Sequence, residues 1–108
     1  MATDKPIVRV LFVKMKQAYH DLSQEDQIAF MRKDRENLDA LGMRALSMVD
    51  CRWSNEDWDF IGVEEWPSLA SLEARAQFEK EELQTPRYIH SRSYVGSPVS
   101  FAEYGNDT

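Results

Sequence analysis

The chain has 108 residues, of which 19 are acidic and 13 basic, giving a formal net charge of −6 at pH 7. This length suits one domain. The basic residues are dispersed, which makes nucleic acid and anionic membranes poor partners, because phosphate binding needs clustered Lys and Arg. Cys51 is the only cysteine, so neither an internal disulfide nor a cysteine-based zinc cluster can form.

No apolar run approaches 18 residues, so we predict no membrane-spanning segment. The first six residues contain no apolar signal core. Together with the single cysteine, these features lead us to expect a cytoplasmic protein. Neither a glycine-rich phosphate loop nor a helical set of metal ligands is present, and we expect no cofactor and no metal.

The first predicted element is a strand over residues 7–16. Val10 and Phe12 share one face of its middle part, and Leu11 and Val13 share the other. A strand that is apolar on both faces is covered on both faces. One layer of helices can cover one face, and so short a chain has little left for the other, which favours a second subunit.

A connection over 17–22 leads to a helix that Ser23 caps and that ends near Leu41, where Gly42 supplies a left-handed stop. Asp34 falls within the apolar stripe of this helix, where a carboxylate is costly unless it is paired or near water. Two interpretations stay open: a tilted helix that hydrates Asp34, or a pocket that uses it. The stripe consists of Phe30, Met31, Leu38 and Leu41.

A hairpin of two strands, over 44–53 and 58–66, follows with a polar turn at 54–57. Strict alternation places one set of side chains on the first face of strand 44–53, namely Leu46, Met48, Asp50 and Arg52. It places a second set on the other face, namely Ala45, Ser47, Val49, Cys51 and Trp53.

Ser68 then caps a second helix that runs to about Leu83, and the segment 84–86 ends it. Phe78 points away from its core stripe, as a lone exposed ring or as a contact with another subunit. The predicted stripe consists of Leu69, Leu72, Ala76 and Leu83. A fourth strand covers 88–95, and one of its faces carries Tyr88, His90, Arg92 and Tyr94.

The predicted order of strand, helix, strand, strand, helix, strand is the split βαβ arrangement of ferredoxin-like α+β proteins. It gives a four-stranded antiparallel sheet with helices on one face, and leaves the other face open for a partner. We predict a single domain over 1–108, with its core at 7–95 and an extended tail at 96–108.

Two segments resemble a known superfamily. The first is the junction of residues 63–72, Val-Glu-Glu-Trp-Pro-Ser-Leu-Ala-Ser-Leu, and the second is Thr-Pro-Arg-Tyr at 85–88. Both look like the dimeric α+β barrel proteins, and the likeness runs from about Val8 to Val95. It implies a homodimer whose relatives include cofactor-free monooxygenases, isomerases, polyketide cyclases and haem enzymes.

The chain departs from some of these relatives. Residues 73–77 lack the histidine that the monooxygenases usually carry in the second helix, and neither His20 nor His90 lies in a predicted helix that could offer a haem ligand. Size and architecture are also similar to the small HapK/PigK-type accessory proteins of prodigiosin biosynthesis. That likeness implies a part in antibiotic or pigment biosynthesis, with other biosynthetic enzymes as further partners.

Two residues are candidates for proton transfer. His20 lies beside Tyr19 and Asp21 in a loop, where a neutral imidazole next to a carboxylate can act as a general base; it can equally be a solvated loop residue. Glu64 shares a strand face with aromatic residues, which would raise its pKa. The alternative is a structural ion pair of Glu64 with an arginine of a neighbouring strand, such as Arg92 or Arg52.

The remaining candidates are residues that could bind a ligand: Tyr19, Asp34, Arg52, Trp66, His90, Arg92 and Tyr94. Those of the last strand suit either a pocket or a wet dimer interface. We therefore expect a homodimer in small-molecule biosynthesis that binds a compact, partly aromatic ligand. Its role is cofactor-free proton transfer or an accessory function; the alternative is a non-catalytic ligand-binding or scaffolding dimer.

Overall fold

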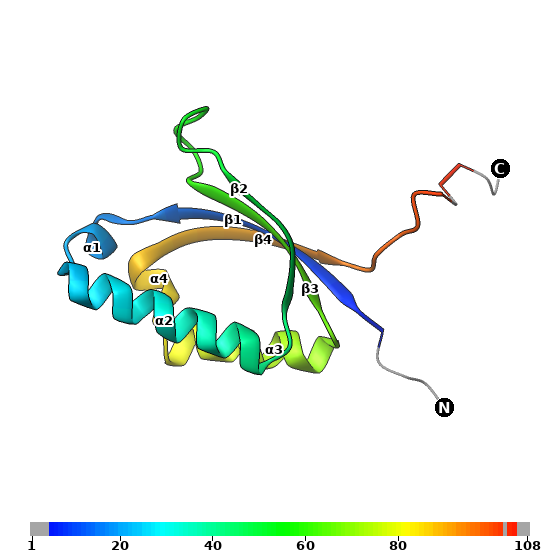
Figure 1. Cartoon of the computed structure of the whole chain (residues 1–108), viewed down its shortest axis with the longest axis horizontal. Helices are drawn as coiled ribbons and strands as arrows, with labels where there is room; N and C mark the ends of the chain where they lie inside the picture. Colours follow the sequence, from blue (N-terminus) through cyan, green and yellow to red (C-terminus); the bar gives the residue numbers. More distant parts are fainter. Residues whose placement is uncertain (1–4, 103, 106–108) are drawn as a thin grey trace.

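The structure is a computed structural model that describes residues 5–102 and 104–105. Figure 1 shows the elements in chain order. They are β1 (Ile7–Met15), α1 (Gln17–His20), α2 (Gln24–Ala40), β2 (Arg44–Asp50), β3 (Phe60–Trp66), α3 (Leu69–Glu81), α4 (Thr85–Tyr88) and β4 (Ile89–Gly96). Positions 103 and 106–108 of the predicted tail lie outside the described residues.

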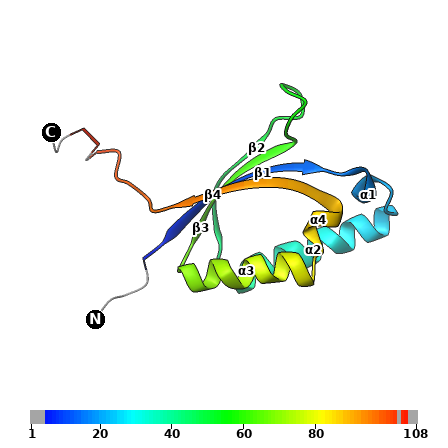
Figure 2. The same ribbon diagram turned by 180° about the vertical axis from the view of Figure 1, so that it is seen from behind.

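The four strands form one sheet in the order β2-β3-β1-β4, and every neighbouring pair is antiparallel. The long helices α2 and α3 lie on the same side of this sheet, and the segment after β4 runs away from it (Figures 1 and 2). The predicted four-stranded antiparallel α+β architecture is therefore confirmed. None of the helices within the described ranges is long and apolar enough to cross a bilayer.

Local capping signals fix where the long helices begin and where α2 ends. The hydroxyl of Ser23 accepts a hydrogen bond from the backbone N–H of Asp26, and that of Ser68 accepts one from Ser71, each at 3.1 Å. Gly42 has a φ of +81°, the left-handed conformation that follows many helices. The predicted starts and this stop are confirmed. The two predicted connections each contain a short helix, α1 and α4.

Strict alternation gives the wrong faces for β2. A bulge between Ala45 and Ser47 changes the register, so that Ala45 lies opposite Glu64 and Met48 lies opposite Gly62. Because a bulge inserts one extra residue, it moves the following side chains to the other face of the strand. Ala45 and Met48 consequently lie on the same, helix-facing side, and β2 ends at Asp50 rather than Trp53.

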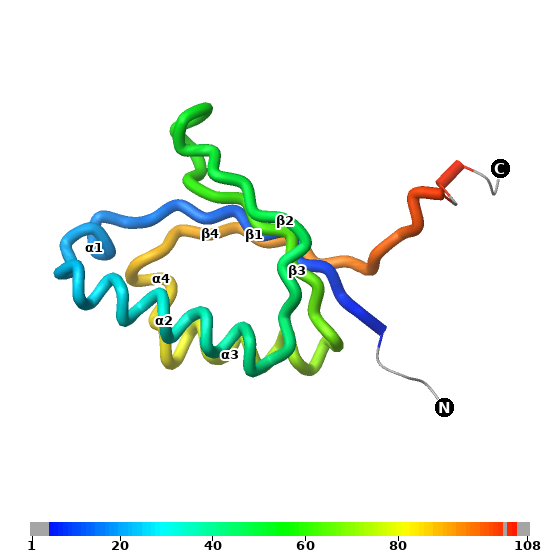
Figure 3. Tube along the Cα trace, viewed as in Figure 1, coloured from blue at the N-terminus to red at the C-terminus, as the bar shows by residue number. Residues whose placement is uncertain are grey.

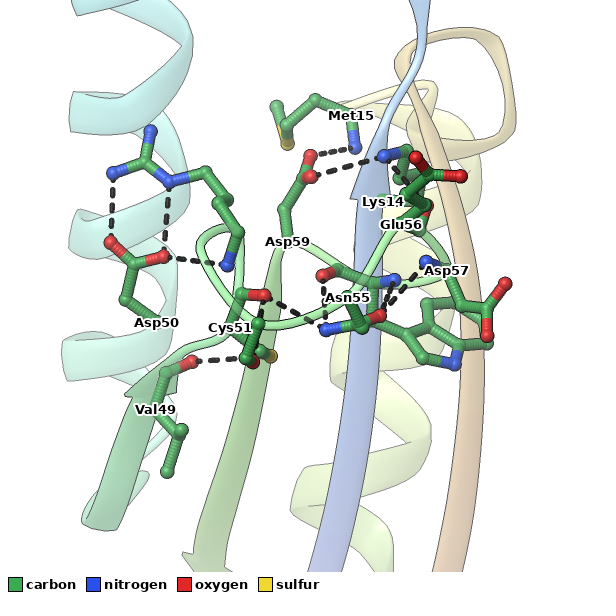
Figure 4. A network of polar contacts seen from close by, with 12 residues as sticks. Lys14, Met15, Val49, Asp50, Cys51, Asn55, Glu56, Asp57 and Asp59 are labelled. Atoms are coloured by element: carbon green, nitrogen blue, oxygen red, sulfur yellow. Dashed lines mark hydrogen bonds and ion pairs between the residues drawn. The ribbon is translucent and has the colours of Figure 1, made fainter.

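Residues 51–59 form an ordered loop in place of the predicted strand ends (Figure 4). The Asn55 side chain accepts hydrogen bonds from the N–H groups of Asp57 and Trp58, each at 2.8 Å, and donates one to the Cys51 carbonyl at 2.8 Å. Asp59 accepts from the Met15 N–H at 2.9 Å, which ties the loop to β1.

The buried face of α3 differs from its predicted stripe. Leu72 and Leu83 are buried as predicted, but Leu69 is 55% exposed, and Arg75 is buried with 4% exposure. Phe78 is half-buried, with the Lys33 ammonium of α2 lying 6.0 Å from its ring centroid, so it is not a lone exposed ring. The face of α3 that meets the sheet therefore includes charge.

Gly42→Ala should lower the free energy of unfolding by about 1–2 kcal/mol, because an L-residue is strained in the left-handed region. An added Cβ would also lie 3.3 Å from Pro67 Cγ. Gly96→Ala is the control, since no described residue other than its two chain neighbours has an atom within 4 Å of its added Cβ, and it should change stability by less than about 1 kcal/mol. Urea denaturation followed by circular dichroism measures both, and equal losses would contradict this account of the α2 stop.

Candidate functional site

A cavity of about 300 Å³ lies between the sheet and the helices. All four strands contribute to its wall, together with α2, α3 and α4. Its apolar side chains include Leu11, Val13, Phe30, Leu38, Phe60, Leu83 and Ile89. An apolar pocket with a few polar groups is the usual form of a small-molecule site, and this volume is at the lower end of the range for such sites.

Methionine is concentrated in this cavity. Four of the five methionines of the chain line it: Met15, Met31, Met43 and Met48. Met31 on α2 is 43% exposed and Met48 on β2 is 68% exposed, so the cavity meets solvent between these two elements. Methionine is flexible and polarizable and contacts aromatic rings favourably, which suits a wall that adapts to a flat ligand.

Glu64 is the most deeply buried carboxylate in the wall, with 6% exposure. Its Oε1 accepts hydrogen bonds from Arg9 Nε at 2.6 Å and from Trp66 Nε1 at 3.1 Å. Its Oε2 has no hydrogen bond within the described part of the chain. Glu64 therefore pairs with an arginine of a neighbouring strand, as the structural alternative predicted, but this arginine is Arg9 and not Arg92 or Arg52.

The ion pair extends across the fold from sheet to helices. Both terminal nitrogens of Arg9 donate to Glu79 of α3 at 3.3 Å, and Arg75 Nε donates to the same carboxylate at 3.0 Å. Arg75 also donates to Asp34 and to Asn37 of α2. A continuous ionic network therefore joins β3, β1, α3 and α2 along one side of the cavity.

Both guanidinium groups of this network are 5% exposed at the side chain. Burial by itself lowers the pKa of Arg9, but the hydrogen bond to Glu64 and the charges of Glu79 and Glu64 outweigh burial and leave the pKa above its ordinary value. Arg9 therefore stays charged. Three carboxylates, those of Asp34, Glu64 and Glu79, face two guanidiniums.

The wall contains further polar groups, namely those of Asp34, Ser47, Thr85 and Ser91. Asp34 is half-buried, lines the cavity, and pairs through its Oδ1 with Arg75. This favours the pocket interpretation of its place in the apolar stripe. The Thr85 hydroxyl is buried and has no hydrogen-bond partner among the described residues, although Thr85 lines the cavity.

The other predicted residues near α1 and β3 lie around the cavity, not in its wall. His20 ends α1, is exposed, and does not line the cavity. Tyr19 is buried, which raises its pKa, and its ring lies 5.6 Å from that of the cavity residue Phe30. Trp66 is fully buried, and its Nε1 donates a hydrogen bond to Glu64. The structure does not bring His20 and Glu64 together at the cavity.

Arg52 stands at the edge of this region, in the β2–β3 loop. It is exposed, and it holds Asp50 with Nε at 3.0 Å and NH2 at 2.8 Å, which lowers the pKa of that carboxyl (Figure 4). Its guanidinium lies 5.0 Å from the ring of Phe60. Arg52 is thus already paired on the surface and does not line the cavity.

The candidates on β4 lie on the opposite side of the sheet. His90, Arg92 and Tyr94 face Lys14, Phe12 and Val10 in the register with β1, while Leu11 and Val13 line the cavity. The His90 ring stacks on Trp58 at 5.4 Å, and Tyr94 meets Phe12 edge-on at 6.2 Å. His90 also borders an outer depression near α4 with Lys16 and Lys80. These three residues are surface or interface residues, separate from Glu64.

Sequence reasoning missed Arg9, Arg75 and Glu79. For Arg9, the signal is a charged residue in an otherwise apolar strand, at a position whose side chain lies on the face opposite to the open face of the sheet. The signal for the other two is their helical spacing from Leu72 and Leu83, which places them in the core stripe of α3 in the way that Asp34 lies in that of α2.

Comparison with known proteins gives fold relatives only. No protein-family model and no curated protein matches the chain. A solved protein of unknown function from Rhodopseudomonas palustris is 18% identical, with a TM-score of 0.61 over 90% of this chain and 85% of that one. A dabb family protein with a ferredoxin-like fold from Mesorhizobium loti is 14% identical, with a TM-score of 0.58 over 88% and 98%.

A hypothetical protein from Arabidopsis thaliana is also 14% identical, with a TM-score of 0.63 over 93% of this chain and 94% of that one. The chain has the ferredoxin-like α+β fold. At these identities the likeness concerns the fold alone. The neighbours support the ferredoxin-like fold that the order of the elements predicts, and they give no support to the HapK/PigK-type accessory proteins in particular.

Arg9→Met should cost about 3–5 kcal/mol of unfolding free energy, because it leaves Glu64 buried without a counter-charge. Arg35→Met is the matched control: Arg35 pairs with Asp39 at 3.5 Å, but its side chain is 78% exposed, so its loss should cost less than about 1 kcal/mol. Urea denaturation compares the two. A loss for Arg9→Met as small as that of the control would show that the network does not hold the core together.

Proposed function

We propose that this chain binds a compact, partly aromatic small molecule in the cavity and serves in the biosynthesis of a small-molecule secondary metabolite. The observation that carries the proposal is Glu64 Oε2, an ionisable oxygen that has no hydrogen-bond partner among the described residues and lies in a methionine-lined, mostly apolar cavity. The methionines and Phe30 would contact the flat face of the ligand, and the carboxylate would orient its polar edge.

In this proposal, the chemistry is proton transfer without a cofactor. A carboxylate within hydrogen-bond reach of a bound ligand can take a proton from one atom and return it to another, which is the basis of isomerisation and cyclisation. Arg9 and Trp66 would hold Glu64 in one orientation, and Asp34 would offer a second carboxylate in the same wall. His20 has no part in this scheme.

A narrower role, as an accessory protein of prodigiosin-type pigment biosynthesis, is a further part of the proposal and rests on size and architecture. The second candidate function, a non-catalytic ligand-binding or scaffolding dimer, is favoured by one observation: His20 and Glu64 do not meet. In that case Glu64 would orient a ligand and transfer no proton.

We further propose that the chain is a homodimer formed through the open face of the sheet. The long helices α2 and α3 lie on the other side (Figures 1 and 2), so no helix of the described residues covers this face in a single chain. It carries Tyr94, which is 58% exposed, and Val49, which is 48% exposed. The apolar side chains that continue this face are Val8, Val10, Phe12, Ile61 and Val63. Burial of such a surface against a second copy would stabilise both.

N-phenyl-1-naphthylamine, a neutral probe that fluoresces in apolar surroundings, should bind saturably with one site per chain. Ala45→Phe places an aromatic ring in the cavity wall and should weaken this binding at least about tenfold, because a pocket this small cannot hold both the added phenylalanine ring and the probe. Ala29→Phe is the control, since Ala29 is exposed on α2 and does not line the cavity. Absence of saturable binding, or equal binding by the two variants, would contradict the proposal.

Tyr94→Glu should convert a dimer of twice 12.6 kDa into a monomer, because it introduces charge into the proposed interface. Sedimentation equilibrium at micromolar concentration measures the mass. Trp53→Glu is the control: it also replaces an exposed aromatic side chain by a charge, but Trp53 lies in the β2–β3 loop, where it is 86% exposed. This change should leave the dimer intact. A wild-type chain that sediments as a monomer would refute the dimer.

A further inference from the structure

The cavity wall offers two carboxylate oxygens that can only accept a hydrogen bond, whereas its hydroxyl groups, those of Ser47, Thr85 and Ser91, can donate as well as accept. Glu64 Oε2 and Asp34 Oδ2 have no hydrogen bond with any residue in the described ranges, and both side chains line the cavity. The Thr85 hydroxyl, buried and unpartnered among the same residues, can accept as well as donate. A ligand with an O–H or N–H group would satisfy these oxygens.

The donors of the network are already in use. Each side-chain nitrogen of Arg75 donates to a protein oxygen, namely of Glu79, Asn37 or Asp34. Each side-chain nitrogen of Arg9 donates to Glu64 or Glu79, and Arg9 does not line the cavity. An anionic ligand would therefore compete with the carboxylates of the protein for the same two guanidiniums.

The net charge of the wall also disfavours an anionic ligand. Three carboxylates face two guanidiniums, which leaves one net negative charge beside a mostly apolar space. No described lysine lines the cavity: Lys16 and Lys80 border the outer depression, which shares Glu79, Thr85, Ile89 and Ser91 with the cavity, and Arg52 is paired with Asp50. A unit charge several ångströms away, at an effective dielectric constant of about 20, changes affinity about tenfold or more.

We propose that the cavity selects uncharged ligands that carry a hydrogen-bond donor and rejects anions of the same shape. This inference rests on the proposed function, because it assigns a ligand class to the same cavity. The ligand would be a flat, compact phenol, alcohol, pyrrole or amide whose donor meets Glu64 Oε2 or Asp34 Oδ2. A carboxylate, sulfonate or phosphate on the same skeleton would bind poorly.

Displacement of N-phenyl-1-naphthylamine by three compounds on one ring system tests the inference. Naphthalene-1-sulfonamide carries a neutral donor, methyl 1-naphthyl sulfone replaces the donor by a methyl group, and naphthalene-1-sulfonate is the anion. The sulfonamide should bind about tenfold or more tightly than the sulfonate, and a few-fold more tightly than the sulfone. Equal displacement by the sulfonamide and the sulfonate, with the probe itself bound, would overturn the inference and leave the proposed function standing.

Variants separate charge from shape. Glu64→Gln and Asp34→Asn each remove one negative charge with little change in volume, and each should narrow the preference for sulfonamide over sulfonate to a few-fold or less. Asp34 is half-buried, so its variant tests the inference even if Glu64→Gln does not fold. Glu65→Gln is the control, because Glu65 pairs with Arg44 on the other face. An unchanged preference in Asp34→Asn and Glu64→Gln would overturn the inference, and failure of the probe to bind the wild type would overturn both proposals.

Discussion

The pairing of Arg9 with Glu64 is the interaction on which the rest of the structure depends. Two adjacent strands each turn a charged side chain towards the helices, and a buried charge is tolerated only with a partner. Because Arg9 also holds Glu79, and Glu79 holds Arg75, the pair fixes α3 on the sheet. Asp34 extends the same contacts to α2. The network thereby sets the position of the helices that enclose the cavity.

Stability alone does not require such a network, since well-packed apolar side chains often stabilise a core as much as a buried ion pair does. What an apolar replacement could not supply is Glu64 Oε2, a polar atom held in place inside a methionine-lined space. A fixed carboxylate gives an apolar cavity orientation and chemical preference. The same contacts that organise the core therefore prepare the site.

Local signals made most of the fold predictable from the sequence. The serine caps at Ser23 and Ser68 and the glycine stop at Gly42 depend on neighbours within four residues, and all three are confirmed. The bulge after Ala45 was not predictable, because alternation carries no sign of an inserted residue. The predicted face of α3 was wrong in part because it left out Arg75, although the spacing of Arg75 from Leu72 puts it in the core stripe.

The candidate site was predicted only in part, for a physical reason. Glu64 and Asp34 stand out because a carboxylate among apolar neighbours is visible in one segment. Their partners are not, because Arg9 is 55 positions from Glu64 and Arg75 is 41 from Asp34. Only the packing of α2 and α3 on the sheet brings them together. From the sequence alone, His90, Arg92 and Tyr94 suit either a pocket or an interface, and only the register with β1 places them on the far face of the sheet.

The most direct test of the account is methyl NMR of the methionines during titration with N-phenyl-1-naphthylamine. We expect large shift changes and contacts with the probe for Met15, Met31, Met43 and Met48, which line the cavity from strands, helix and loop. We expect little change at the Tyr94 ring, on the opposite face. Unchanged methionine signals, with the response confined to the open face of the sheet, would contradict the central claim that the ligand site is this cavity.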